Sequence, residues 1–377
     1  MGKNTSAFAS RYIIDGQITD ATPRQILEAL GAVPQEIIPE CGYDDIIDES
    51  ADPAPLEEQP SPSAIQECAK ATAGATRRSF PLSYCGSLSR LAVATAALDI
   101  LFRKGSFKLG DISVDALWEW DEGRIGSAAA FYESVSCAAE YIEGLGLNLR
   151  RYGYKSTDSI RLKVTASIEG SDSAEPSDAL FEESPFSSAS PHLESGRLCP
   201  EKAVGTAGNW LIYIPFDTCR YRLGGSLLSQ EMRFPGGKSP DLSDPDYFID
   251  CYEVVRELIE DGFAKSGTFV GDGGLMTALG RHCNGKSIKA DISGIMHACE
   301  ESDPVKVLFG EIPGAIIEIQ DADFDYLDVE LLLQDVAYYP LGQFSGTDGE
   351  LEVDFADRYD IQGILQSLIH GASEGED

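Results

Sequence analysis

The stretch FAKSGTFVGDGGLMTALGRHC, residues 263–283, decides the fold. A short apolar and β-branched run, Gly267–Val270, leads into a glycine-rich turn, Gly271–Gly274, and apolar residues at helical spacing follow. This order predicts a strand, a tight turn and a helix. The glycines allow two interpretations: a cradle in which backbone N–H groups and the helix N-terminus bind phosphate, or a tight turn with no ligand.

The same alternation of helices and strands runs through most of the chain. Thr22 and Pro23 read as the cap and first residue of a helix that ends at Gly31. Further helices are predicted at 88–102, 128–145, 246–263, 274–283 and 326–336. Strands are predicted within 108–120 and at 160–170, 209–216, 267–270, 287–293, 314–319 and 349–353. Alternating helices and strands imply a layered α/β architecture.

Composition divides the chain into four regions. Residues 1–75 are predicted to be an N-terminal extension that contains an acidic, proline-rich linker at 42–63. A first folded unit spans 76–200 and carries a Ser/Pro/acidic insertion at 169–196, interpreted as a mobile surface loop. The second unit spans 201–358. Residues 359–377 are expected to form a C-terminal helix and an acidic tail.

The net charge of −34, from 63 acidic and 29 basic residues, argues against nucleic acid and anionic membranes as partners. No apolar run reaches about 18 residues, so no membrane span is expected. The nine cysteines form no Cys-x-x-Cys pair, which favours reduced thiols and argues against a zinc site. The N-terminus lacks the apolar core of a signal peptide. Together these features predict a cytoplasmic protein.

Three further motifs suit phosphate or cation binding. The turn Leu223–Ser226 combines two glycines with a hydroxyl, which suits either a phosphate or a bare turn. Asp158 and Ser159 end a polar stretch that suits a phosphate–Mg²⁺ site, although a polar loop is the favoured interpretation of this stretch taken alone. Glu311, between apolar Phe309 and an apolar strand, could ligate a cation or cap a neighbouring element; its spacing favours the cap.

The order of these motifs resembles the aminoimidazole ribonucleotide synthetase-like superfamily, and within it the second synthetase half of the large phosphoribosylformylglycinamidine synthases. That family has Gly-Lys-Asp-Ser, Leu-Gly-Gly-Ser, Gly-His-Asp-x-Ser-x-Gly-Gly-Leu and Leu-Phe-x-Glu-x-x-Gly in this order. The matching residues here are Asp158-Ser159, Leu223–Ser226, Gly273–Leu275 and Leu308–Gly314. The resemblance covers about residues 80–355.

The resemblance implies a two-domain fold with a dimerising sheet in the first domain and an α/β sandwich in the second. It therefore implies a homodimer, with ATP or ADP and Mg²⁺ bound in the cleft between the domains. By this resemblance Asp158 and Glu311 are the candidate Mg²⁺ ligands. The candidate nucleotide and phosphate contacts are Ser159, Gly224, Gly225, Ser226, Asp272, Gly273 and Gly274.

The residues that differ from the family pattern are ones that the family's motifs supply for the reaction. The family's His-Asp-x-Ser reads Thr268–Gly271 here, and Thr157 replaces the lysine before Asp-Ser. We find no glutaminase segment and assign no catalytic residue. Two hypotheses follow: an ATP-dependent C–N ligase of purine biosynthesis that phosphorylates an amide oxygen, or a non-catalytic dimeric binding or structural protein that keeps the fold. The replaced residues favour loss of the full reaction.

Overall fold

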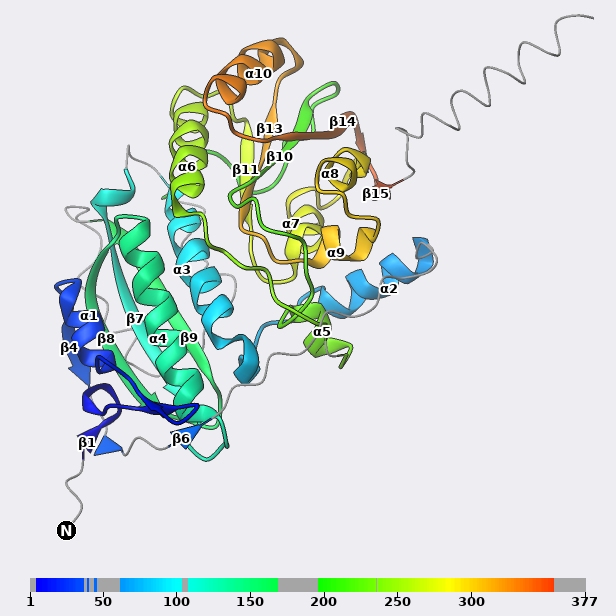
Figure 1. Ribbon diagram of the computed structural model, residues 1–377. Helices are drawn as coiled ribbons and strands as arrows, with labels where there is room; N and C mark the ends of the chain where they lie inside the picture. Colours follow the sequence, from blue (N-terminus) through cyan, green and yellow to red (C-terminus); the bar gives the residue numbers. More distant parts are fainter. Residues whose placement is uncertain are drawn as a thin grey trace, which may run out of the picture.

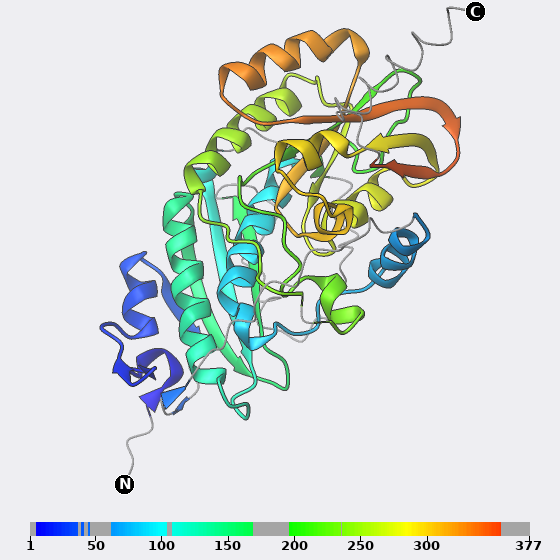
Figure 2. The same cartoon turned by 45° about the vertical axis from the view of Figure 1, so that its right-hand side comes forward.

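The computed structural model describes residues 5–36, 39–40, 44–45, 62–103, 108–168, 196–234 and 236–355. Two α/β units lie side by side, each built on one main sheet (Figures 1 and 2). The fold class is therefore the predicted one. The predictions for the acidic linker, the 169–196 insertion and the C-terminal tail fall almost wholly outside the described residues.

The first unit contains a four-stranded sheet in the order β4-β8-β7-β9, with β7 parallel to β8 and antiparallel to β9. Helices α3 and α4 pack on one face of it, and Trp118 Nε1 donates to Ser134 Oγ of α4 at 2.9 Å. The elements of this unit are β4 (Val33–Glu36), α3 (Cys85–Leu101), β7 (Ile112–Trp120), α4 (Ser127–Gly144), β8 (Asn148–Ser156) and β9 (Arg161–Ile168).

The other face of this sheet is charged. Asp115 and Glu119 of β7 point to this side and are buried beneath long basic side chains. A β-bulge between Val114 and Asp115 lets two consecutive arginines of β8 reach one carboxylate. The cations are Arg150 and Arg151 on Asp115, and Arg161 and Lys163 on Glu119. The face that the resemblance assigns to a dimer is thus covered by ion pairs rather than by apolar side chains.

The second unit contains a six-stranded sheet in the order β11-β13-β10-β14-β12-β15, in which only β12 and β15 pair in parallel. Its strands are β10 (Trp210–Pro215), β11 (Ser266–Val270), β12 (Lys286–Asp291), β13 (Gly314–Ile319), β14 (Tyr339–Asp348) and β15 (Leu351–Asp354). Its helices are α5 (Leu227–Glu231), α6 (Pro245–Glu260), α7 (Gly274–His282), α8 (Ser293–Ala298), α9 (Pro304–Phe309) and α10 (Phe324–Leu333).

The N-terminal residues belong to the first unit. Helix α1 (Pro23–Ala29) packs against α4, and Phe8 lies in the core with its ring centroid 4.8 Å from that of Tyr152. The short elements of this region are β1 (Thr5–Ser6), η1 (Ala7–Ala9), β2 (Ile13–Ile14), β3 (Gln17–Ile18), β5 (Pro39–Glu40) and β6 (Asp44–Asp45).

Helix α2 (Pro62–Thr72), which the sequence analysis did not identify, packs instead on α5 and α7 of the second unit. The chain then runs back toward the first unit and enters η2 (Leu82–Tyr84) and α3. Residues 82–101 are long and apolar enough to pass for a membrane span, but 67% of that segment is buried, as in a core helix. Helix α3 contacts elements of both units. The remaining short helices are η3 (Leu109–Asp111) and η6 (Asp321–Asp323).

Candidate functional site

Arg77, in the segment between α2 and α3, projects between the two glycine turns. Its Nε donates to Asp272 Oδ1 at 3.1 Å, and its terminal nitrogens donate to Glu311 Oε2 and to the carbonyl of Gly225. The side chains of Arg77 and Glu311 are 5% and 2% exposed. Burial alone would lower the pKa of Arg77, but Asp272 and Glu311 outweigh it and raise that pKa. One guanidinium therefore joins three segments that are distant in sequence.

Glu311 caps both turns with its other carboxylate oxygen. Oε1 accepts from the N–H groups of Leu227 and Gly273, each at 2.8 Å. Leu227 begins α5, and Gly273 immediately precedes α7. Burial raises the pKa of Glu311, while Arg77 and the two N–H groups favour its ionised form. This is the capping role that the spacing of Glu311 favoured.

Four of the six backbone N–H groups expected to bind phosphate, those of Gly224, Ser226, Gly273 and Gly274, have acceptors within the protein. The N–H of Gly224 donates to the Lys238 carbonyl at 2.9 Å, and that of Ser226 donates to the Leu223 carbonyl at 3.0 Å. The N–H of Gly274 donates to the Gly271 carbonyl at 2.9 Å. The Ser226 hydroxyl accepts from the Ser229 N–H and caps α5. These contacts support the interpretation of both segments as tight turns.

Close packing explains why two of these positions are glycine. A Cβ on Gly224 would lie 2.2 Å from the Gly237 carbonyl oxygen. Gly274 has a φ of +68°, and its Cβ would lie 2.7 Å from the Leu308 carbonyl oxygen. Both turns therefore press directly on neighbouring backbone, where even a methyl group has no room.

Asp158 and Ser159 lie in the short connection between β8 and β9, two strands that lie on opposite sides of β7 in the sheet. Thr157 Oγ1 donates to the Ser159 carbonyl at 2.9 Å, and the N–H of Ile160 donates to Ser79 Oγ at 2.9 Å. This connection thus adjoins the segment that carries Arg77. Asp158 is exposed, and no hydrogen bond or ion pair between described residues links Asp158 or Ser159 to Glu311 or to the glycine turns. Three of the predicted site residues, Gly225, Asp272 and Gly273, are thus joined through Arg77 and Glu311. Asp158 and Ser159 lie near this cluster but do not belong to it.

The residues present do not fit Mg²⁺. Both oxygens of Glu311 are engaged by donors of the protein, and the remaining candidate ligand, Asp158, lies in the connection between β8 and β9. In the described part of the chain no group of three or more His, Cys, Asp or Glu side chains is placed to hold a metal. The cation found with Glu311 is Arg77.

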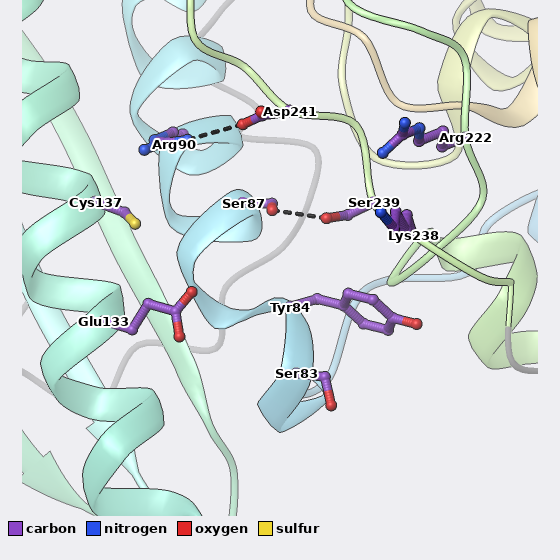
Figure 3. A pocket seen from close by; sticks show the side chains of 10 residues that line it. All are labelled: Ser83, Tyr84, Ser87, Arg90, Glu133, Cys137, Arg222, Lys238, Ser239 and Asp241. Carbon is purple, nitrogen blue, oxygen red and sulfur yellow. Dashed lines mark hydrogen bonds and ion pairs between the residues drawn. The ribbon is translucent and has the colours of Figure 1, made fainter. Parts of the chain in front are cut away.

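A cavity of about 290 Å³ opens between the two units (Figure 3). Its walls are α3, α4 and the chain around 222 and 238–241. Ser87 Oγ lies 2.7 Å from Ser239 Oγ, and Arg90 Nη1 donates to Asp241 Oδ1 at 3.1 Å. These two contacts bridge the units beside the cavity. The sequence analysis missed this site because its lining residues come from segments that are distant in the chain.

Tyr84 connects this cavity to the ion-pair cluster of Arg77, Asp272 and Glu311. Its side chain fills the space beside Gly225, where an added Cβ would lie 2.9 Å from Tyr84 Cβ, and its hydroxyl donates to the Gly237 carbonyl at 2.5 Å. Cys137 lines the same cavity, and burial raises the pKa of its thiol to about 11. The thiol is therefore protonated at neutral pH and is not a nucleophile.

Comparisons with known proteins agree with the resemblance seen in the sequence. No family model matches the chain. It is 26% identical to human phosphoribosylformylglycinamidine synthase over 248 residues, 62% of this chain and 16% of the human protein. The probable chloroplastic/mitochondrial synthase of Arabidopsis thaliana is 25% identical over 68% of this chain and 17% of its own length. The synthase of Drosophila melanogaster is 24% identical over 69% and 19%.

Solved structures superimpose only loosely. T. maritima PurL complexed with AMPPCP gives a TM-score of 0.47 at 8% identity, over 78% of this chain and 46% of that one. E. coli HypE, a hydrogenase maturation protein, gives 0.43 at 12% identity, over 72% and 78%. The chain spans less than a fifth of the length of the three curated relatives. Over roughly two thirds of its own length, it is similar in sequence to the phosphoribosylformylglycinamidine synthases, as the ordered motifs predicted.

Proposed function

We propose that this chain is a phosphoribosylformylglycinamidine synthase-related protein that binds a nucleotide or another phosphorylated small molecule between its two units without catalysing the ATP-dependent ligation. The observation that carries this proposal is the position of Arg77. Its buried guanidinium occupies the space between Glu311 and Asp272, where a ligase of this kind would need an exchangeable cation.

The chemistry explains why this arrangement argues against turnover. Phosphorylation of an amide oxygen by ATP needs a metal ion that moves with the phosphates and a group that polarises the amide. Arg77 is tethered to the chain and is held by two carboxylates, so it cannot follow the transferred phosphate. At the position of the family's His-Asp-x-Ser, Thr268 is a buried residue of β11, and its hydroxyl oxygen accepts from Arg281 at 3.2 Å.

Ligand binding is supported by the cavity beside this cluster. Arg222 and Lys238 line it, together with Arg90, which is paired with Asp241 and Glu140, although the chain as a whole carries a net charge of −34. Basic side chains gathered in a hollow of an acidic protein favour an anionic ligand. The homodimer and the cytoplasmic location remain parts of the proposal.

A second candidate function is a protein that keeps only the fold and binds no nucleotide. The internal hydrogen bonds of the glycine turns favour it, because they satisfy the N–H groups of Gly224, Ser226, Gly273 and Gly274 without a ligand. A measurement of nucleotide binding therefore distinguishes the two candidate functions.

Thermal unfolding of the full chain, with ATP or ADP and with either MgCl₂ or EDTA, tests the proposal. We expect nucleotide to stabilise the protein equally with and without Mg²⁺, by about 2.7 kcal/mol at ~100 times the dissociation constant. A parallel assay for phosphate release should show no ATP hydrolysis. Stabilisation that requires Mg²⁺, or ATP turnover, would overturn the non-catalytic proposal; absence of any stabilisation would favour the second candidate.

A further inference from the structure

We infer that the cavity between α3, α4 and residues 236–241 binds a nucleoside phosphate, with Arg222 and Lys238 holding the phosphate and Glu133 accepting hydrogen bonds from N–H groups at the opposite end. This inference rests on the proposed function and adds to it the site and the orientation of the ligand. Figure 3 shows Arg222 and Lys238 with their nitrogens turned toward α3, across the cavity from Glu133 and Cys137.

The two cations are positioned by the Leu223–Ser226 turn. Arg222 immediately precedes the turn, and the Lys238 carbonyl accepts from the N–H of Gly224 at 2.9 Å. The close contact of Gly224 with the backbone of Lys238 fixes this approach. An arginine gives a planar pair of donors that matches two phosphate oxygens, and a lysine adds a compact charge. The glycine turn thus acts on the ligand through the side chains that it positions.

Arg90 has a different role. Its guanidinium donates to Asp241 and to Glu140, each at 3.1 Å. These two carboxylates offset its charge, so Arg90 contributes little to the attraction of an anion. It joins α3 to α4 and to the 236–241 segment, and together with the Ser87–Ser239 contact it fixes the width of the cavity.

The opposite wall offers room for the rest of the ligand. A second cavity of about 350 Å³ is also lined by Glu133 and Cys137. It adds the apolar and aromatic side chains of Ile14, Ala129 and Tyr132, with Asp15 and Ser136 beside them. Both volumes are of the size that small-ligand sites occupy. An aromatic and apolar wall suits a planar ring, and a carboxylate at the junction suits the exocyclic N–H groups of a base. The cavity therefore offers partners for a phosphate, for a planar ring and for the N–H groups of that ring, which are the parts of a nucleoside phosphate.

Isothermal titration of the full chain in EDTA tests this assignment, with AMP, ADP and orthophosphate as probes. We expect R222Q/K238Q to weaken AMP and ADP binding on the order of tenfold or more. Glu133→Gln should weaken AMP and leave orthophosphate unchanged, because only AMP reaches that wall. The matched control R124Q/K265Q removes an arginine and a lysine that lie outside the cavity, and it should bind like the wild type. Urea unfolding of each variant verifies that it is folded.

The outcomes separate this inference from the proposed function. AMP or ADP binding that R222Q/K238Q leaves intact would overturn the cavity assignment alone, because the chain would still bind nucleotide elsewhere. An equal loss for AMP and orthophosphate in Glu133→Gln would overturn the orientation. If the wild-type chain binds neither AMP nor ADP, the proposed function falls and this inference falls with it.

Discussion

Arg77 and Glu311 are 234 residues apart in the chain and form a buried ion pair that joins the segment after α2 to both glycine turns. The groups at this junction come from four segments. The guanidinium belongs to the segment between α2 and α3, and the Glu311 carboxylate belongs to the loop after α9. The Gly225 carbonyl and the Leu227 N–H come from the turn that leads into α5, and Asp272 and the Gly273 N–H come from the turn that leads into α7. The pair therefore couples the position of α2 to the geometry of the turns.

Removal of Arg77 should destabilise the protein strongly. Arg77→Ala leaves the Glu311 carboxylate buried without its counter-charge, which costs about 3–5 kcal/mol in comparable buried pairs. The control Arg124→Ala breaks a more exposed pair with Asp121 and should cost less than about 1 kcal/mol. Urea unfolding measures both. The double variant R77M/E311Q should cost less than Arg77→Ala, because it leaves no buried charge unpaired and its amide oxygen can still accept from the N–H groups of Leu227 and Gly273. Equal costs for the two arginines would contradict the buried-pair account.

The close packing of the Gly271–Gly274 turn can be tested within one helix. In Gly274→Ala the new methyl group would lie 2.7 Å from a backbone oxygen at a φ of +68°, so we expect a loss of about 2 kcal/mol or more. Gly280, in the same helix, has open space around its Cβ position, and Gly280→Ala should stabilise by up to about 1 kcal/mol. Thermal denaturation compares them. A tolerated Gly274→Ala would mean that this turn has more room than the packing indicates.

His282 should make stability depend on pH. It is fully buried, Nδ1 lies 2.5 Å from the Glu201 carbonyl oxygen, and burial lowers its pKa from 6.5 to about 4. A depressed pKa means that the unfolded chain binds the proton more tightly. The stabilisation is therefore complete above about pH 6.5 and is lost as the pH falls toward 4, by about 3 kcal/mol in total.

Urea unfolding of the wild type and of His282→Gln, between pH 7.5 and 5, measures this effect. The variant should be less stable at pH 7.5 and should lose less stability than the wild type as the pH falls. Exposed His297 provides the control, and His297→Gln should keep the wild-type slope. Parallel pH profiles for the wild type and His282→Gln would show that this imidazole is not the group responsible.

The charged sheet face makes a specific prediction about the proposed homodimer. Two copies that meet through β7 and β9 would bury Asp115, Glu119 and their basic partners against each other. Lys163→Glu places a carboxylate beside Glu119 and should convert the dimer to monomer in sedimentation velocity experiments. Lys265→Glu, in the second unit, should leave the dimer intact. A monomeric wild type, or a Lys163→Glu dimer, would rule out association through this face.

The local elements followed from the sequence because their signals lie within a few residues. Thr22 and Gln25 form the capping box that starts α1, with Pro23 in the first turn as predicted. The buried strands β10 and β13 and the amphipathic α6 also occur where their patterns placed them. Helix α2 had a usable signal that was missed: apolar Ile65, Cys68 and Ala69 are spaced as on one helix face, and Pro62 is its first residue.

The amino-acid sequence by itself determined the α/β alternation, the caps and the positions of the tight turns, because these depend on interactions between neighbouring residues. Only the tertiary structure decided that Arg77 neutralises Glu311 and that Arg222 and Lys238 line one cavity with α4. The physical reason is that a buried ion pair or a binding cavity depends on which distant segments exclude water together. No spacing along the chain encodes that arrangement.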